Sequence, residues 1–573
     1  MRSLREAGGD SDSPPGQNRT ADEILLLCCS VLFLIAACVL WSPHKQVWMD
    51  EIFTWKEVSD HSLLHLYYAI QHGADGGQPL FYTTAWLWAK AFGTSVLTLR
   101  LYSSVAMCTA LLVSWRSIRR FYGLWATAFG VLMFWGTSNV LLEQNVEARF
   151  YGLYMLAVAV TVDLYTRLVA RPAPTRLLLL VALFSQAALV LTHVLGLIYS
   201  GLILLALILV DAAKGRLRWR LYFVYAAGWL ALMVWLPAIR SSMAAGKPHG
   251  WIAMPNLTDL RTAYLFADSL SWLRFFKRRS LEVGFQIVRR TAEFVIYVPL
   301  AVVFVLGVRR ILRSGWRTIA SPRGSLLLLA YLLLSAPTVL FVLSHLVAPV
   351  FVPRYFLPSG IGLAIVLAAS ADGLGADTHI RPRWALRSMW AGVIAFLMIS
   401  PMLTVLAVGP INLSWDFLDV QRLEQELPQD VPVVAGWQED FVKLMRLGHN
   451  PEARYYFLLD WPGALAGPRA FVLDYHLMQA YRSNGYYSKN IQDSDGFLCS
   501  HPDFVVLDAP NGSTLDAHNN NTPDMQKPNW FDTNIRTAAE FEWKVIAALD
   551  APEVTRKLVI VHRRRPLPFC SQP

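Results

Sequence analysis

Long apolar runs fill most of the first four hundred residues. The first of them, residues 24–41 (ILLLCCSVLFLIAACVLW), holds no ionisable side chain apart from its cysteines. A helix of this length rises about 27 Å, close to the roughly 30 Å of hydrocarbon in a bilayer. The run exceeds the roughly 7–15 residues of a signal-peptide core, so we expect an uncleaved anchor. Similar runs predict about eleven transmembrane helices, at 24–41, 98–117, 121–141, 150–168, 176–192, 194–210, 221–239, 291–310, 324–345, 355–371 and 388–407.

Two longer loops interrupt this series, at residues 42–97 and 240–290. The first holds two amphipathic stretches, 52–70 and 80–92, whose Trp and Tyr side chains are typical of helices lying in the membrane interface. The second contains the basic amphipathic segment 272–279, which we expect to lie on anionic headgroups.

The pattern changes after residue 410. Residues 411–573 are polar, and short apolar runs at 431–435, 470–473, 504–507 and 558–561 predict strands around helical stretches such as 440–447. This alternation predicts a small C-terminal α/β domain. Residues 511–528 are predicted to form a loop.

Charge sets the orientation of this chain. Segments that alternate with the predicted spans each carry at least three Lys or Arg: 1–23, 116–120, 167–176, 214–220, 309–323 and 381–387. Short cytoplasmic loops collect such residues, which predicts a cytoplasmic tail at 1–23, a transmembrane domain at 24–410 and an extracytoplasmic domain at 411–573. We therefore expect a multi-pass protein of the cell (inner) membrane.

Composition agrees with a membrane location. The chain is 55% hydrophobic and 16% charged, against about a quarter charged in soluble domains. Its formal charge of +10 would suggest nucleic acid in a soluble protein, but here the basic residues fall in loops and no nucleic-acid partner is expected. Cys499 and Cys570 lie in the polar C-terminal part and would be free to pair in an extracytoplasmic domain. No cysteine spacing typical of a metal site is present.

Several polar and aromatic residues fall at the predicted outer face, where ionisable groups are costly and usually functional. They are Asp50, Glu51, Gln78, Glu147, Arg149, Tyr151, His193, Arg354 and Tyr355. Structural explanations also exist: the acids suit a helix first turn, the arginines can reach headgroups, and His193 can cap a helix. As a set they predict more, because Arg149 and Arg354 open helices that begin outside, and a helix N-terminus with a guanidinium binds anions.

Short motifs in this chain resemble landmarks of a known enzyme group. Met49-Asp50-Glu51 follows the first span, and Gln78-Pro79-Leu80-Phe81-Tyr82, residues 92–100, residues 147–151 and residues 353–358 come later in matching order. Together they resemble the GT-C superfamily of membrane glycosyltransferases, closest to the protein O-mannosyltransferase-like and lipid A aminoarabinose transferase-like enzymes. The resemblance covers roughly residues 24–407.

This resemblance implies an inverting transferase that uses polyprenyl-phosphate sugars as donors. Asp50 would be the catalytic base, and Arg149 and Arg354 would neutralise the donor phosphate. Glu51 and Gln78 would orient the acceptor or organise the loop, and the substrate pocket would include Glu147, Tyr151, His193 and Tyr355. Gln78 stands where the family often has His. The sequence requires no cofactor, and it leaves open whether a divalent metal is used. The acceptor is expected to be an envelope lipid, glycan or protein, at a site flanked by membrane lipids.

Two other classes remain as alternatives. A transporter or flippase for lipid-linked saccharides would share the membrane location, but such proteins often carry internal repeats and helices broken at mid-membrane. A ligase that moves a whole glycan from a pyrophosphate carrier would share the arginines without the early Asp-Glu pair.

Overall fold

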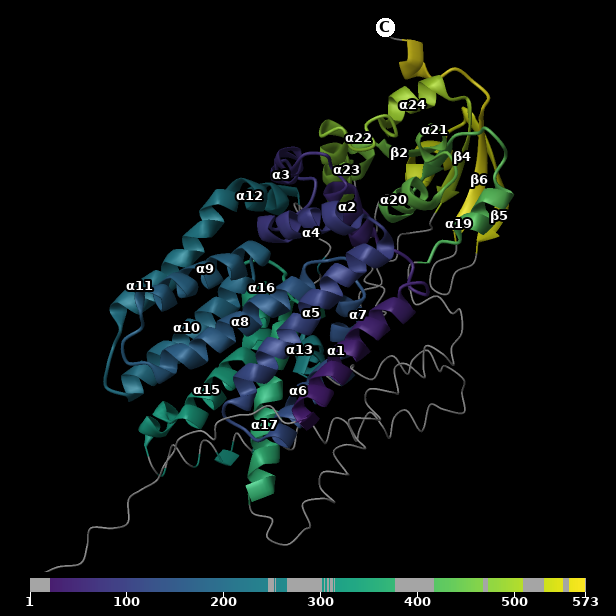
Figure 1. The fold of residues 1–573 in the computed structure, drawn as a ribbon. Helices are drawn as coiled ribbons and strands as arrows, with labels where there is room; N and C mark the ends of the chain where they lie inside the picture. Colours follow the sequence, from purple (N-terminus) through teal and green to yellow (C-terminus); the bar gives the residue numbers. More distant parts are fainter. Residues whose placement is uncertain are drawn as a thin grey trace, which may run out of the picture.

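The computed structural model describes residues 21–245, 254–264, 315–376, 417–466, 472–508, 530–549 and 556–571, with isolated positions at 252 and between 301 and 313. Residues 1–20 of the predicted cytoplasmic tail, the basic segment 272–279, most of the predicted span 291–310, all of the predicted span 388–407 and the predicted loop 511–528 lie outside these ranges. Figure 1 shows a helical bundle with a mixed α/β unit at one end.

Seven helices or helix pairs of the described chain are long and apolar enough to cross a membrane. Four are continuous: α1 (Ala21–Trp41), α5 (Val96–Arg119), α8 (Tyr151–Ala170) and α10 (Gly196–Ala213). The other three change pitch or break: α11 (Trp219–Ala227) runs through η1 (Gly228–Trp235) into α12 (Leu236–Ala245), α15 (Pro322–Leu334) meets α16 (Ala336–Leu346), and η5 (Pro353–Ser359) leads into α17 (Gly360–Ala376). Two shorter apolar helices, α6 (Leu124–Thr137) and α9 (Arg176–Thr192), complete the set. The count of eleven spans stays a prediction.

Small residues let the bundle helices approach closely. A Cβ on Gly152 of α8 would lie 2.3 Å from the carbonyl oxygen of Ser103 on α5, and one on Gly130 of α6 would lie 2.2 Å from that of Ala364 on α17. Any side chain at these two positions would push the helices apart. Close helix contacts of this kind are typical of membrane proteins.

The predicted amphipathic stretch 52–70 is two helices, not one. Helix α2 (Met49–Val58) ends at Ser59, and α3 (Leu63–Gln71) begins after Ser62, whose hydroxyl caps it. The break follows from Asp60, whose carboxylate accepts a hydrogen bond from the Ser62 amide and so competes with a continuous helix. The second predicted stretch is α4 (Pro79–Phe92). Short helices α7 (Asn139–Asn145), α13 (Leu257–Tyr264) and η4 (Trp316–Ala320) connect the larger elements.

The C-terminal unit is built on a six-stranded sheet of order β3-β2-β1-β4-β6-β5. The first four strands in that order are parallel, and β6 runs antiparallel to both of its neighbours, β4 and β5. The strands are β1 (Val433–Ala435), β2 (Tyr455–Leu459), β3 (Ile491–Asp493), β4 (Asp503–Asp508), β5 (Phe541–Leu549) and β6 (Arg556–Arg563). The helices are α19 (Val420–Glu426), α20 (Gln438–Leu447), α21 (Pro451–Arg454), α22 (Trp461–Ala466), α23 (Leu473–Ser483), α24 (Ser494–Ser500), η6 (Asp532–Arg536) and η7 (Pro568–Ser571).

The predicted α/β class of this unit is confirmed, and three of its four predicted strands are present as β1, β4 and β6. The fourth prediction, at 470–473, is wrong where the chain is described, because Leu473 begins α23 and its apolar side chains belong to an amphipathic helix. Cys499 and Cys570 form a disulfide that ties α24 to η7.

Candidate active site

Three predicted site residues from distant parts of the chain meet at one carboxylate. Asp50 lies in the first turn of α2, Arg149 lies two residues before α8, and Arg354 lies in η5. Oδ2 of Asp50 is 3.8 Å from Nε of Arg149 and 3.9 Å from Nη2 of Arg354. The Asp50 side chain keeps 22% of its surface exposed. It is therefore a carboxylate that solvent or a substrate can reach, with two guanidinium groups beside it.

Glu51 points away from this cluster into a closed ion pair. Arg100 of α5 donates two hydrogen bonds to it, from Nε to Oε1 at 2.8 Å and from Nη2 to Oε2 at 2.7 Å. The amides of Ala148 and Trp48 donate to the same carboxylate. Burial alone would raise the pKa of Glu51, but the Arg100 charge outweighs it and holds that pKa well below its ordinary value. These contacts fasten the start of α2 to α5 and to the segment before α8.

Arg149 is held by more than Asp50. Its Nη1 is 3.0 Å from Oδ2 of Asp75 and donates to Oγ1 of Thr54 at 3.1 Å and to the carbonyl of Asp50 at 3.3 Å. Burial alone would lower its pKa, but Asp75 and Asp50 raise the pKa of Arg149 well above its ordinary value. Arg149 therefore joins the Asp50 cluster to a second, more enclosed group of acids.

That second group was not predicted from the sequence. Tyr82 of α4 donates its hydroxyl hydrogen bond to Asp75, and Glu57 of α2 lies fully buried beside them. Burial, and then the charge of Asp75, raise the pKa of Glu57 well above its ordinary value. In the sequence, Asp75 stands in a turn-rich stretch and Glu57 on an amphipathic helix, where acids usually face solvent. Glycines on either side of Asp75 signalled only a turn.

Glu147 is buried, and its Oε1 lies 3.6 Å from Nζ of Lys45. Burial raises the pKa of Glu147 to about 7, against the opposing charge of Lys45. Lys45 and Arg100 are further members of the site that we did not single out for a role from the sequence. Lys45 follows the first predicted span and Arg100 lies at the start of the second. Basic residues are common at such positions beside the membrane, so the sequence alone does not distinguish these two.

Aromatic rings line the arginine side of the cluster. Arg354 lies over the rings of Trp48 and Tyr151, at 5.2 and 5.8 Å from their centroids. His193, just after α9, lies between Phe150 and Tyr355, with ring centroids 4.6 and 5.1 Å away. Burial and the nearby arginines lower the pKa of His193 to about 3. Its Nδ1 accepts from the Leu195 amide, so it also shapes the turn into α10.

Gln78 is the buried residue that precedes α4, and its side-chain oxygen finds no hydrogen-bond partner among the described residues. It lies next to Gly77, whose carbonyl accepts from the Trp235 indole. Within the described chain no group of three or more His, Cys, Asp or Glu is arranged to hold a metal ion.

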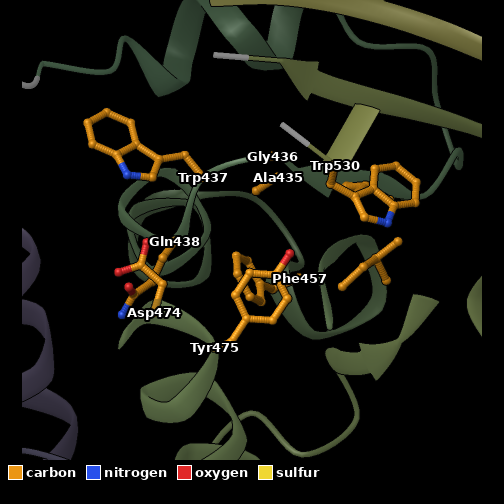
Figure 2. Close-up of a pocket in the computed structure, with 10 residues that line it drawn as sticks. Ala435, Gly436, Trp437, Gln438, Phe457, Asp474, Tyr475 and Trp530 are labelled. Carbon is orange, nitrogen blue, oxygen red and sulfur yellow. The ribbon is translucent and has the colours of Figure 1, made fainter. Parts of the chain in front are cut away.

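A separate hollow lies in the α/β unit, at the carboxyl ends of β1 and β2. Figure 2 shows Gln438 and Asp474 on one side of it and Trp530 on the other. Open α/β sheets often bind ligands at this edge. The cavity volume is about 30 Å³, enough for one or two water molecules.

Comparison with known proteins places the fold. The structure matches the crystal structure of ArnT from Cupriavidus metallidurans bound to undecaprenyl phosphate, with a TM-score of 0.50 and 14% identity over 96% of this chain and 99% of that one. The apo structure of the same protein matches with a TM-score of 0.51 and 12% identity, over 96% of this chain and 98% of that one. No family model and no curated protein matches this chain. The fold implied by the sequence resemblance is confirmed, because this chain shares the fold of the two ArnT structures over nearly its whole length.

Proposed function

We propose that this protein is an inverting glycosyltransferase, which moves a sugar from a polyprenyl-phosphate carrier to an envelope acceptor at the extracytoplasmic face of the membrane. The observation that carries this proposal is the meeting of Arg149 and Arg354 at the accessible carboxylate of Asp50. A carrier phosphate and an acceptor hydroxyl need those two kinds of group side by side. The fold supports it, since the ArnT with this fold was crystallised with undecaprenyl phosphate.

In this mechanism Asp50 takes the proton of the acceptor hydroxyl. The acceptor oxygen then bonds to the anomeric carbon, on the face opposite the phosphate, while the carbon–oxygen bond to the phosphate breaks. The electron pair of that bond stays on the carrier phosphate, whose added negative charge the arginines neutralise. A positioned base contributes about 10²–10⁴-fold, and fixed charges facing the leaving group act without reorganisation.

The two arginines would both face the phosphate site. Arg149 is fastened to Asp75 at 3.0 Å, and Nη2 of Arg354 lies 3.9 Å from Oδ2 of Asp50. Arg149 would therefore also keep Asp50 and α2 in place while both guanidinium groups face a phosphate that arrives beside Asp50. The aromatic rings of Trp48 and Tyr151 orient the Arg354 guanidinium.

The Cys499–Cys570 disulfide supports an extracytoplasmic location for the α/β unit, because such bonds persist outside the reducing cytoplasm. Helix α2, which carries Asp50, lies between the bundle and the α/β unit (Figure 1). With that orientation, the Asp50 cluster would face the same side as the α/β unit.

The test is mass spectrometry of membrane lipids and envelope glycans from cells with and without the gene. We expect a glycan, lipid or protein to lose one sugar residue and the matching polyprenyl-phosphate sugar to accumulate. An unchanged set of sugar modifications would refute the proposal. Loss of a whole oligosaccharide, with a pyrophosphate carrier accumulating, would indicate a ligase instead.

A further inference from the structure

Helix α2 carries Asp50 in its first turn, and its opposite end is held by the α/β unit. Tyr481 of α23 donates a hydrogen bond from its hydroxyl to Oε1 of Glu57, at 3.0 Å. Both side chains are completely buried. The ring of Tyr481 also packs on Phe53, one turn earlier on α2, with centroids 5.1 Å apart. Residues 424 positions apart in the chain therefore form one contact inside the protein.

Further contacts secure α2 on both sides of this bond. Before the helix, Gln46 and Leu418 exchange two hydrogen bonds, from Nε2 to the carbonyl at 2.7 Å and from the Leu418 amide to Oε1 at 2.9 Å. On the helix, the guanidinium of Arg446 lies 3.9 Å from the ring centroid of Trp55. After it, the hydroxyl of Tyr486 donates to Asp60 at 2.6 Å.

The hydrogen bond between Tyr481 and Glu57 is connected to the Asp50 cluster through a series of neighbouring side chains. Glu57 lies within the electrostatic reach of Asp75 and of the Tyr82 hydroxyl that donates to Asp75. Asp75 holds Arg149, and Arg149 lies beside Asp50. Helix α2 spans only about 15 Å, so displacement of its last turn moves its first turn as well.

We propose that the α/β unit positions the catalytic helix, and that Tyr481 is a positioning residue for the transfer reaction through its hydrogen bond to Glu57. This inference rests on the proposed function, in which Asp50 must face the anomeric carbon. A misplacement of about 1 Å at a reacting group lowers the rate by about 10²-fold. A domain that lies outside the membrane thus determines the geometry of a base at the membrane surface.

The test uses Tyr481→Phe in the full chain, which removes the hydroxyl and keeps the ring on Phe53. Three measurements apply: hydrogen exchange of residues 49–58 in nanodiscs, affinity for undecaprenyl phosphate, and the envelope product in cells complemented with the variant. We expect exchange in α2 to rise about tenfold and product to fall about tenfold, with exchange in α5 and affinity for undecaprenyl phosphate unchanged. If Tyr481 contributed only to general stability, its replacement would change exchange in α2 and α5, the affinity for undecaprenyl phosphate and the product together.

Tyr456→Phe is the matched control. Its hydroxyl donates to Ala453 within the same α/β unit, so its loss should leave all three measurements at wild-type values. Glu57→Gln, which keeps an acceptor oxygen for Tyr481, should lose less product than Tyr481→Phe.

Unchanged α2 exchange in Tyr481→Phe would overturn the proposal, as would faster exchange with wild-type product. If deletion of the gene changes no envelope product at all, the proposed function fails instead. Hydrogen exchange then still decides whether the α/β unit holds α2.

Discussion

Asp50 and Glu51 are adjacent in the sequence, yet their carboxylates have opposite environments. Glu51 is 1% exposed and fully occupied by Arg100 and two backbone amides, while Asp50 is 22% exposed and faces two guanidinium groups at 3.8 and 3.9 Å. Neighbouring residues on a helix point about 100° apart, so one first turn serves two purposes. This geometry agrees with the expected role of Glu51 in organising the loop and with the proposed role of Asp50 in proton transfer.

Asp50→Asn is expected to reduce turnover by about 10²–10⁴-fold, because the amide keeps the shape and loses the basicity. Affinity for undecaprenyl phosphate should be retained. Turnover can be followed as the envelope product in complemented cells, with Asp503→Asn, an exposed acid paired with His562, as the control. Near-normal turnover in Asp50→Asn would exclude this residue as the base.

Glu51→Gln is expected to destabilise the fold. It leaves the buried Arg100 guanidinium without its counter-charge, a change that costs about 3–5 kcal/mol. Thermal unfolding in detergent should show a clear fall in the midpoint temperature. A Glu51→Gln protein with the wild-type midpoint and no turnover would instead assign Glu51 to the chemistry.

Arg354→Gln should weaken binding of undecaprenyl phosphate by roughly ten- to a hundredfold, since a charge-assisted contact contributes about 1.5–3 kcal/mol. Its unfolding temperature should change little. Arg149→Gln should weaken binding and also lower that temperature, because Asp75 loses its partner. Arg323→Gln, which breaks an exposed pair with Asp372, is the control for loss of a charge. Unchanged binding in both site variants would indicate that these arginines contact lipid headgroups and do not bind the donor phosphate.

Stability should fall as pH rises through neutrality. Burial raises the pKa of Glu147 to about 7, so the folded state prefers the protonated acid. Its stabilising contribution is complete below the ordinary value of about 4.5 and is lost as pH rises through about 7. Glu57, whose pKa is also raised, acts in the same direction. Glu147→Gln mimics the protonated form and should flatten the unfolding temperature between pH 5 and 8, while the exposed Glu542→Gln should keep the wild-type slope.

A phosphatase fused after Gly409 should be active and a galactosidase fused there inactive, since the α/β unit is proposed to be extracytoplasmic. Strong galactosidase activity would reverse the orientation.

Cys499→Ser should lower the unfolding temperature of the α/β unit, because it removes the disulfide to Cys570. Adding a reductant should have the same effect on the wild type.

The sequence predicted site residues where a polar side chain stands next to an apolar run. Asp50, Arg149 and Arg354 stand out beside apolar runs, and the structure brings these three together. Asp75, Glu57 and Tyr481 do not stand out, because acids on turns and amphipathic helices are ordinary. Glu57 and Tyr481 are buried where the α/β unit contacts α2, and no local pattern encodes that contact.

Dependence on contacts between distant segments also explains why strands β2 and β5 were not predicted from the sequence. β2 is a five-residue run, YYFLL, that becomes a strand by pairing with β1 and β3 on either side. β5 is an edge strand that exposes Trp543, Val545 and Ile546, so its sequence lacks the clean alternation of a half-buried strand. The central runs of β1, β4 and β6 were recognisable because buried strands need little context.

The bond between Tyr481 and Glu57 also has a consequence for biosynthesis. Its two residues are separated by 424 positions, so at 5–20 residues per second the ribosome needs roughly 20 to 85 seconds to make the second after the first. During that interval the segment that carries α2 has been made and lacks this restraint. A nascent or truncated chain would thus keep the Glu51 contacts but lack the proposed restraint on the far end of α2, and full competence to consume the donor would begin only when translation has passed Tyr481.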